Sequence, residues 1–153
     1  MGQGVVILCL SSKAGKIIGE IVAKKLGLSF FDIDFQIVQL LQNKLTTNAN
    51  AIKVFDAAQC LAVKQALTQQ NTVVCVSYDV FARYQEQFHA YEKFYMALPK
   101  DELNKFDDDD YLLNSIAFRD RYKFLESVCV KIDATGFDKE RISDIIIKKI
   151  RTR

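Results

Sequence analysis

The sequence predicts an α/β protein, a three-layer α/β/α sandwich in which helices cover both faces of a parallel sheet. Short apolar runs bounded by polar residues recur along the chain, which is typical of strands buried on both faces of a sheet. Helical patterns lie between these runs, so successive strands are joined by right-handed crossovers. No repeat, linker or low-complexity segment divides the 153 residues, and we expect one domain spanning residues 1–153.

The apolar runs are rich in Val, Ile, Phe or Cys and predict five strands. They are Val5–Leu10, Leu28–Phe31, Thr72–Ser77, Phe94–Leu98 and Val128–Ile132. The helical patterns alternate with them in chain order. They are Gly15–Leu26, Phe35–Asn43, Ala51–Gln69, Val80–Tyr91, Lys100–Phe106, Tyr111–Leu125 and Asp138–Ile150. The last pattern starts at a side chain suited to an N-cap, Asp138, and places isoleucines on one face.

Composition limits the classes of partner. A formal net charge of +2 is too small to indicate a nucleic-acid-binding protein. No apolar run reaches the roughly 20 residues of a membrane span, and the first residues do not resemble a signal peptide, so we expect a cytoplasmic protein. The four cysteines, Cys9, Cys60, Cys75 and Cys129, lack metal-site spacing and are expected to be reduced, buried thiols.

The N-terminal segment has the layout of a phosphate-binding unit: an apolar strand, a loop of small residues and a helix. The candidate nucleotide or anion loop consists of Ser11, Ser12, Lys13, Ala14, Gly15 and Lys16. A helix N-terminus with lysines nearby attracts anions, whereas the simpler interpretation is a solvated loop that opens a helix. Both interpretations remain open.

Two alignments with the P-loop motif Gly-x-x-x-x-Gly-Lys-Ser/Thr compete. Pairing Gly15-Lys16 with its Gly-Lys keeps the lysine, but places Leu10 at the first glycine and Ile17 at the hydroxyl position. The gap-free alignment through the helix places Gly15 at the lysine and Lys16 at the hydroxyl position. We prefer the second, because deleting one residue would rotate the rest of the helix by about 100°. Both alignments lose the hydroxyl that binds Mg²⁺.

Four stretches, "IIGEIVAKKLGLSFFDID", "NTVVCVS", "EKFYMALPKDELNKF" and "RDRYKFLESVCVKIDATGFDKERISDII", follow one another with the spacing of a known family. In this respect the chain resembles shikimate kinase, a small P-loop kinase of aromatic amino-acid biosynthesis. The resemblance covers nearly the whole chain and implies the strand order 2-3-1-4-5. A shorter resemblance, carried by "SSKAGKIIG", is to the cytidylate-kinase-like family and ends after the second strand.

The Asp32-x-Asp34 pair is the best-kept feature of the resemblance. It implies that Asp32 lies near the metal and that Asp34 binds substrate hydroxyls and acts as an orienting base, with ATP and Mg²⁺ as cofactors of an active enzyme. At the end of a buried strand, both carboxylates are expected to face a crevice beside the loop Ser11–Lys16. The alternative is a strand-end turn in which they cap the next helix.

The substrate contacts that the resemblance implies are mostly absent. Phe55-Asp56 stands where the family has a phenylalanine followed by the arginine that binds the substrate carboxylate. Ser77-Tyr78-Asp79 replaces its glycine triplet. Arg119 lies within one position of the second substrate arginine, although the gap-free register puts Phe118 there, and an ordinary surface arginine is an equal alternative.

The lid also departs from the family pattern. Residues Pro99 to Phe118 contain no arginine to cover the transferred phosphate, and Asp107–Asp110 would repel ATP unless a cation intervened. We therefore expect a shikimate-kinase-like protein with an eroded site, without normal ATP phosphotransfer, that retains a ligand- or protein-binding role. The alternatives are an active small-molecule kinase using Lys16 or Lys13 with Asp32 and Asp34, and a non-catalytic interaction domain, a homo-oligomer included.

Overall fold

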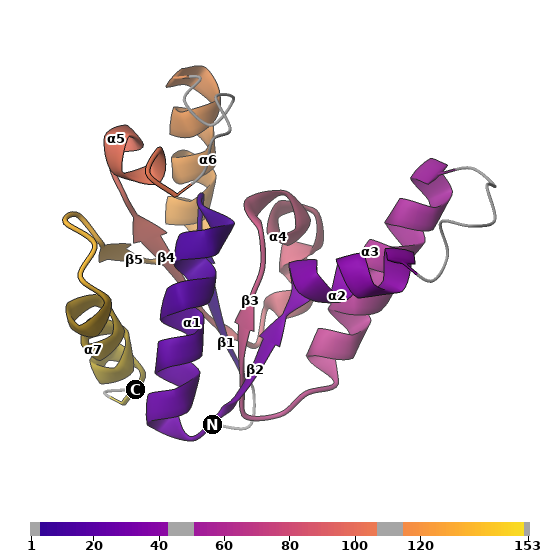
Figure 1. Ribbon diagram of the computed structural model, residues 1–153, viewed down its shortest axis with the longest axis horizontal. Coiled ribbons are helices and arrows are strands. Elements are labelled where there is room, and N and C mark those ends of the chain that lie inside the picture. The colour runs from indigo at the N-terminus through magenta and orange to yellow at the C-terminus, as the bar shows by residue number, and fades with distance from the viewer. Residues whose placement is uncertain (1–3, 43–50, 107–114, 152–153) are drawn as a thin grey trace.

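The computed structural model describes residues 4–42, 51–106 and 115–151 (Figure 1). Its sheet has five parallel strands in the order β2-β3-β1-β4-β5, which confirms the predicted fold class and strand order. The strands are β1 (Val5–Cys9), β2 (Ser29–Asp32), β3 (Thr72–Cys75), β4 (Glu92–Ala97) and β5 (Val130–Asp133). The central strand β1 is fully buried, as its unbroken apolar run predicts.

Helices cover both faces of this sheet. They are α1 (Ser12–Leu26), α2 (Ile33–Gln42), α3 (Ala51–Leu67), α4 (Tyr78–Tyr84), the 3₁₀ helix η2 (Gln85–Phe88), α5 (Lys100–Leu103), α6 (Ser115–Val128) and α7 (Lys139–Arg151). Helices α1 and α7 lie on one face and α4 and α6 on the other, while α2 and α3 project together from the β2 edge (Figure 1). Rings of α4 and α6 meet edge to face, as in the pair Tyr78–Phe124 with centroids 5.9 Å apart.

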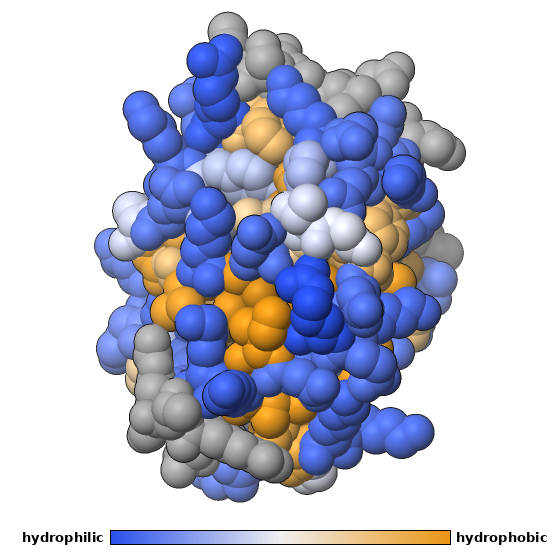
Figure 2. Space-filling model, turned by 90° about the vertical axis from the view of Figure 1, so that its left-hand side faces the viewer, coloured by the Kyte–Doolittle hydropathy of each residue, from blue (hydrophilic) through white to orange (hydrophobic). Residues whose placement is uncertain are grey.

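The helix α7 forms as its sequence predicts. Asp138 Oδ1 accepts hydrogen bonds from the backbone N–H groups of Glu140 and Arg141, so this side chain caps the helix. Ile142 and Ile146 are buried against the core, and Ile145 is half-buried. On the opposite side of α7, Glu140 and Asp144 bond the Lys25 ammonium of α1. Figure 2 shows this side of the molecule, where polar side chains surround an apolar area near α7 and the β5 edge.

Some boundaries differ from the predicted ones. Helix α1 begins at Ser12, three residues before the predicted Gly15, because Ser11 caps it. The predicted helix Val80–Tyr91 is the short α4 followed by η2. The predicted limits Asn43 and Tyr111 lie outside the described residues. Within the described part of the chain, no helix is long and apolar enough to cross a membrane.

All four cysteines are free thiols, and the predicted burial holds only for Cys9 and Cys75. Cys9 and Cys75 are buried on neighbouring strands, whereas Cys60 and Cys129 are only half-buried. Burial raises the pKa of Cys75 far above its usual value and that of Cys129 to about 12, so neither thiol is ionised near neutral pH. These two thiols serve packing, because the thiolate is the reactive form.

Candidate functional site

The junction between β1 and α1 is two residues long. Only Leu10 and Ser11 separate the last residue of β1 from Ser12, the first residue of α1. The P-loop motif, by contrast, is a strand followed by a loop whose free backbone N–H groups surround the phosphates before the helix begins. In this chain the predicted anion loop is instead a helix cap and the first turns of α1.

Two backbone donors of that first turn, those of Ala14 and Gly15, already have partners. The buried Ser11 hydroxyl accepts from the Ala14 N–H at 3.2 Å, and the Ser11 carbonyl accepts from the Gly15 N–H at 3.1 Å. Ala14 and Gly15 are buried, which leaves Ser12 and Lys13 as the exposed residues at the start of the helix. An anion at this end of α1 would therefore meet the helix dipole and two residues, without an encircling loop.

The glycines of α1 serve helix–sheet packing. A Cβ at Gly15 would lie 3.5 Å from the Cys9 nitrogen and 3.6 Å from the Cys75 sulfur, so this position faces the sheet. A Cβ at Gly19 would lie 2.9 Å from Cε1 of Phe30, a distance that real Cβ atoms hardly ever show. Gly19 thus lets α1 approach β2 closely.

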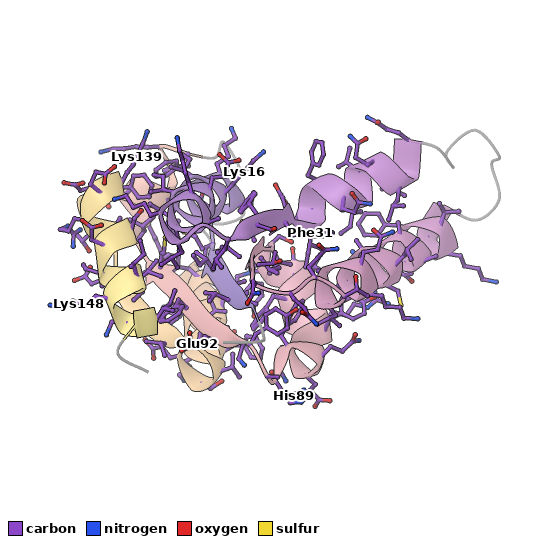
Figure 3. The ribbon with its side chains drawn as sticks, turned by 90° about the horizontal axis from the view of Figure 1, so that it is seen from below. Lys16, Phe31, His89, Glu92, Lys139 and Lys148 are labelled. Carbon is purple, nitrogen blue, oxygen red and sulfur yellow. The ribbon has the colours of Figure 1, made fainter. Side chains whose placement is uncertain are left out.

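Lys16 and Asp32 meet at the carboxyl end of β2. The Lys16 Nζ lies 3.8 Å from Asp32 Oδ2 and 5.9 Å from the centre of the Phe35 ring (Figure 3 labels Lys16 on α1). Asp32 Oδ1 accepts from the Phe35 N–H at 3.1 Å and so caps α2. The two interpretations of Asp32 coexist: it is a helix cap, and it also stands next to the predicted anion-binding lysine.

Asp34 joins α2 to the end of β3. Its Oδ2 accepts from the Ser77 backbone N–H at 2.6 Å, at the residue that precedes α4. Burial is the main cause that raises the pKa of Asp34 above its ordinary value, and the charges of Asp32 and Asp79 raise it further, while the bond from Ser77 opposes them. Keeping this carboxylate ionised therefore lowers the stability of the folded chain. Such a raised pKa is common at functional sites and also occurs in structural networks.

We predict that Asp34→Asn makes the protein more stable at pH 7. A carboxyl whose folded-state pKa is raised adds stability below its unfolded value of 3.8, and loses that contribution as the pH rises through the folded value. Asparagine resembles the protonated carboxyl and can still accept from Ser77. In urea unfolding, the variant should have the higher free energy of unfolding at pH 7. Its advantage over the unmodified chain should shrink as the pH falls toward 3.8. A variant that is less stable at pH 7 would contradict this account.

Arg121 of α6 lies next to the first turn of α4. Arg121 is largely buried, its guanidinium lies 4.7 Å from the centre of the Tyr78 ring, and its Nη2 lies 3.4 Å from Asp79 Oδ1. Arg119 is exposed and lines a surface cavity of about 490 Å³ along α6. Residues two apart on a helix face different directions. The sequence signal that could have identified Arg121 is its spacing from Phe124, since residues three apart lie on the same face of a helix. In the structure that face packs on Tyr78.

A second arginine, Arg83, pairs with Asp56, the residue that stands where the resemblance implies a substrate-binding arginine. Arg83 of α4 donates to Asp56 Oδ1 at 2.9 Å and to Gln59 Oε1 at 3.0 Å, both on α3. Asp56 thus has an internal partner.

A second cavity, of about 340 Å³, adjoins the first between α6 and the ends of β4 and β5. Among the described residues, no group of three or more His, Cys, Asp or Glu could hold a metal ion. Asp107–Asp110 lie outside the described residues.

Comparisons with known proteins agree with this architecture. No protein-family model matches the chain, and no curated protein matches its sequence. Among solved structures, the shikimate kinase of Acinetobacter baumannii in complex with shikimate is 14% identical with a TM-score of 0.72, covering 100% of this chain and 96% of that one. The Aquifex aeolicus shikimate kinase is 9% identical, with a TM-score of 0.67 and coverage of 98% and 97%.

A tunicamycin resistance protein from Deinococcus radiodurans is also similar, with 17% identity, a TM-score of 0.59 and coverage of 97% of this chain and 95% of that one. The chain thus has the fold of small P-loop kinases. Within that class, it has the shikimate kinase fold.

Proposed function

We propose that this chain is a shikimate-kinase-like protein that has lost normal ATP phosphotransfer and keeps a cytoplasmic role in binding a small molecule or a protein. The observation that carries the proposal is the two-residue junction between β1 and α1, in which the Ala14 and Gly15 donors are already used within the helix. Fold and chemistry separate readily in evolution, because the core and the site make different demands on the sequence.

The residues present do not fit MgATP. A phosphate loop supplies backbone donors, a lysine and a metal-binding hydroxyl, and here only Lys16 remains, half-exposed and beside Asp32. The substrate side has lost its arginine at Asp56, which is paired with Arg83. Losses on both sides of the reaction support a protein in which folding has been retained and phosphotransfer has not.

An active kinase with a divergent site is the second candidate. It is favoured by the grouping of Lys16, Asp32 and Asp34 at the carboxyl end of β2, where α/β proteins bind ligands. Such an enzyme would need another means of stabilising the charge of the transferred phosphoryl group.

The test that separates the two candidates is calorimetric titration with MgATP, MgADP and shikimate, each alone, together with a coupled assay of ADP release. We expect no shikimate-dependent ADP release from the full chain. Turnover that depends on shikimate would restore the active-kinase candidate.

A further inference from the structure

The cavity of about 340 Å³ between α6 and the strands β4 and β5, which we call the α6–β5 cavity, has an aromatic wall. The wall consists of Tyr95 of β4 and of Phe118 and Tyr122 of α6. The Tyr122 ring contacts both others, with centroids 4.7 Å from Phe118 and 5.9 Å from Tyr95. The cavity falls in the size range of small-molecule sites. It lies at the opposite edge of the sheet from β2 (Figure 1).

The parallel register of β4 and β5 adds two charged side chains to this cavity. Lys131 pairs with Tyr95, so both point to the same face of the sheet. Asp133, two residues further along β5, points there too, and both charged residues line the cavity. Asp133 Oδ1 accepts from the Thr135 N–H at 3.0 Å and from its hydroxyl at 2.7 Å, and these bonds are the main cause that lowers the pKa of Asp133. This carboxylate is therefore already supplied with donors.

The Tyr95 hydroxyl and the Glu126 carboxylate are neighbours in the wall of the cavity. Tyr95 is 1% exposed, and its buried hydroxyl has no hydrogen-bond partner at bonding distance in the described chain. Burial, followed by the carboxylate of Glu126, raises the pKa of Tyr95 to about 12, so the phenol is uncharged at neutral pH. Glu126 lies on α6, is exposed and lines the same cavity. Within residues 4–42, 51–106 and 115–151, it forms no ion pair.

An ammonium group suits these two oxygen atoms. It carries N–H donors and no acceptor, whereas an ionised carboxylate only accepts and a phenol oxygen can accept. It can thus donate to both Glu126 and the Tyr95 hydroxyl. A polar group that is buried without a partner costs free energy, so a ligand that supplies the missing bond gains affinity from it.

The aromatic wall favours the same kind of ligand. The Lys100 Nζ lies 5.2 Å from the centre of the Phe118 ring, so one ring of the wall already attracts an ammonium group of the chain itself. An anionic ligand would instead meet Glu126, Asp133 and the negative faces of the rings. Lys131 is the only cation among the described residues that line the cavity, and its charge lies beside that of Asp133.

We propose that the α6–β5 cavity binds a small primary amine with an aromatic body, in its protonated form. Glu126 and the Tyr95 hydroxyl receive the ammonium group, and the rings of Phe118 and Tyr122 contact the apolar body. The site lies outside the residues on which the proposed function rests. Its test is therefore independent of whether the chain has lost phosphotransfer.

Three probes with one carbon skeleton test the class of ligand. They are 2-phenylethylamine, which is a cation, 2-phenylethanol, which is neutral, and L-phenylalanine, which adds a carboxylate to the amine. In titrations of the isotope-labelled full chain near neutral pH, followed by amide chemical shifts, we expect the amine to bind with a Kd on the order of 1 mM and about tenfold more tightly than the alcohol. L-Phenylalanine should bind no more tightly than the alcohol, because its carboxylate meets Glu126 and Asp133.

The shifts should be largest for amides of β4, β5 and α6. Equal affinities of the amine and the alcohol, tightest binding of L-phenylalanine, or no saturable shift up to about 20 mM amine would each overturn the proposal. Shifts centred on α1 and β2 would overturn it as well, since they would place the ligand at the other edge of the sheet.

Removal of one charge should abolish the preference for the amine. Glu126→Gln keeps the size of the side chain, and we expect it to weaken the amine about tenfold, to the level of the alcohol, with the alcohol nearly unchanged. The matched control is Glu20→Gln, which removes the same charge from an exposed position of α1. It should leave the affinity for the amine within about twofold. If the two variants weaken the amine alike, the effect is one of total charge, and the assigned role of Glu126 is wrong.

Tyr95→Phe removes the hydroxyl and keeps the ring. We expect it to weaken the amine about threefold to tenfold. The free energy of unfolding should be unchanged or higher, because the hydroxyl has no partner in the free chain. A variant that is less stable in urea but binds the amine as the unmodified chain does would show that the hydroxyl serves the fold alone, and would refute its role in the site.

Discussion

MgATP is expected to bind this chain no more tightly than about 1 mM, roughly −4 kcal/mol of binding free energy. The reason lies in the first turns of α1, where the backbone donors of Ala14 and Gly15 are already used. Ser11 occupies the Ala14 N–H, and Gly15 is buried against the sheet. The metal-binding hydroxyl is absent in both alignments, since Ile17 or Lys16 stands in its place.

The size of the loss follows from the contacts that are gone. Hydrogen bonds to charged groups contribute about 1.5–3 kcal/mol each, and every ~1.4 kcal/mol is a factor of ten in affinity. Losing two such contacts weakens binding by about two to four decades. Asp32 weakens the remaining cation further, because it already stands beside Lys16.

Isothermal titration calorimetry of the full chain with MgATP measures this directly, and a kinase with an intact phosphate loop is the positive control. Weak binding of sulfate or phosphate agrees with the account, because the N-terminus of α1 and Lys16 remain available. Micromolar affinity for MgATP, accompanied by shikimate-dependent ADP release, would contradict it.

Alanine substitutions at the two buried glycines of α1 are expected to act in opposite directions. Gly15→Ala should raise the free energy of unfolding by about 0.5–1 kcal/mol, since alanine favours a helix interior and the new Cβ makes ordinary contacts. Gly19→Ala should lower it by about 1–3 kcal/mol, because its Cβ would lie 2.9 Å from the Phe30 ring. Urea unfolding measures both, and the melting temperature should move by about 2–4 °C per kcal/mol.

This comparison also tests the nature of the junction. A glycine that had to adopt a special loop conformation would not tolerate alanine, so a destabilised Gly15→Ala variant would argue against a plain helix. The control is Phe30→Leu, which removes the ring that Gly19 accommodates. In that background the penalty of Gly19→Ala should largely disappear, since residues in contact are energetically coupled.

The sequence by itself determined the sheet and most of the elements around it. The run Val5–Leu10 predicts a strand buried on both faces, and β1 is the fully buried central strand. The cap at Asp138 and the isoleucines that follow it predict α7. These features depend on residues close together in the chain, whose spacing reveals which face is buried. The strand order, implied by the resemblance to shikimate kinase, is also confirmed.

The start of α1 was harder to predict, because a serine before a run of small residues suits both an extended loop and a helix cap. In the structure Ser11 turns inward and caps the helix, so the predicted loop Ser11–Lys16 forms its cap and first turns. The same helix approaches β2 closely at Gly19.

Only the tertiary structure decided the partners of the charged residues. Asp34 bonds the backbone of Ser77, 43 residues away, and Arg121 meets Asp79 across 42 residues. The resemblance to shikimate kinase pointed to Arg119, whereas the packing of α6 on α4 places Arg121 beside Tyr78 and Asp79. Strands and helices follow from periodicity within a segment, whereas the charge balance of a site depends on which segments meet, and that is set by the packing of the whole domain.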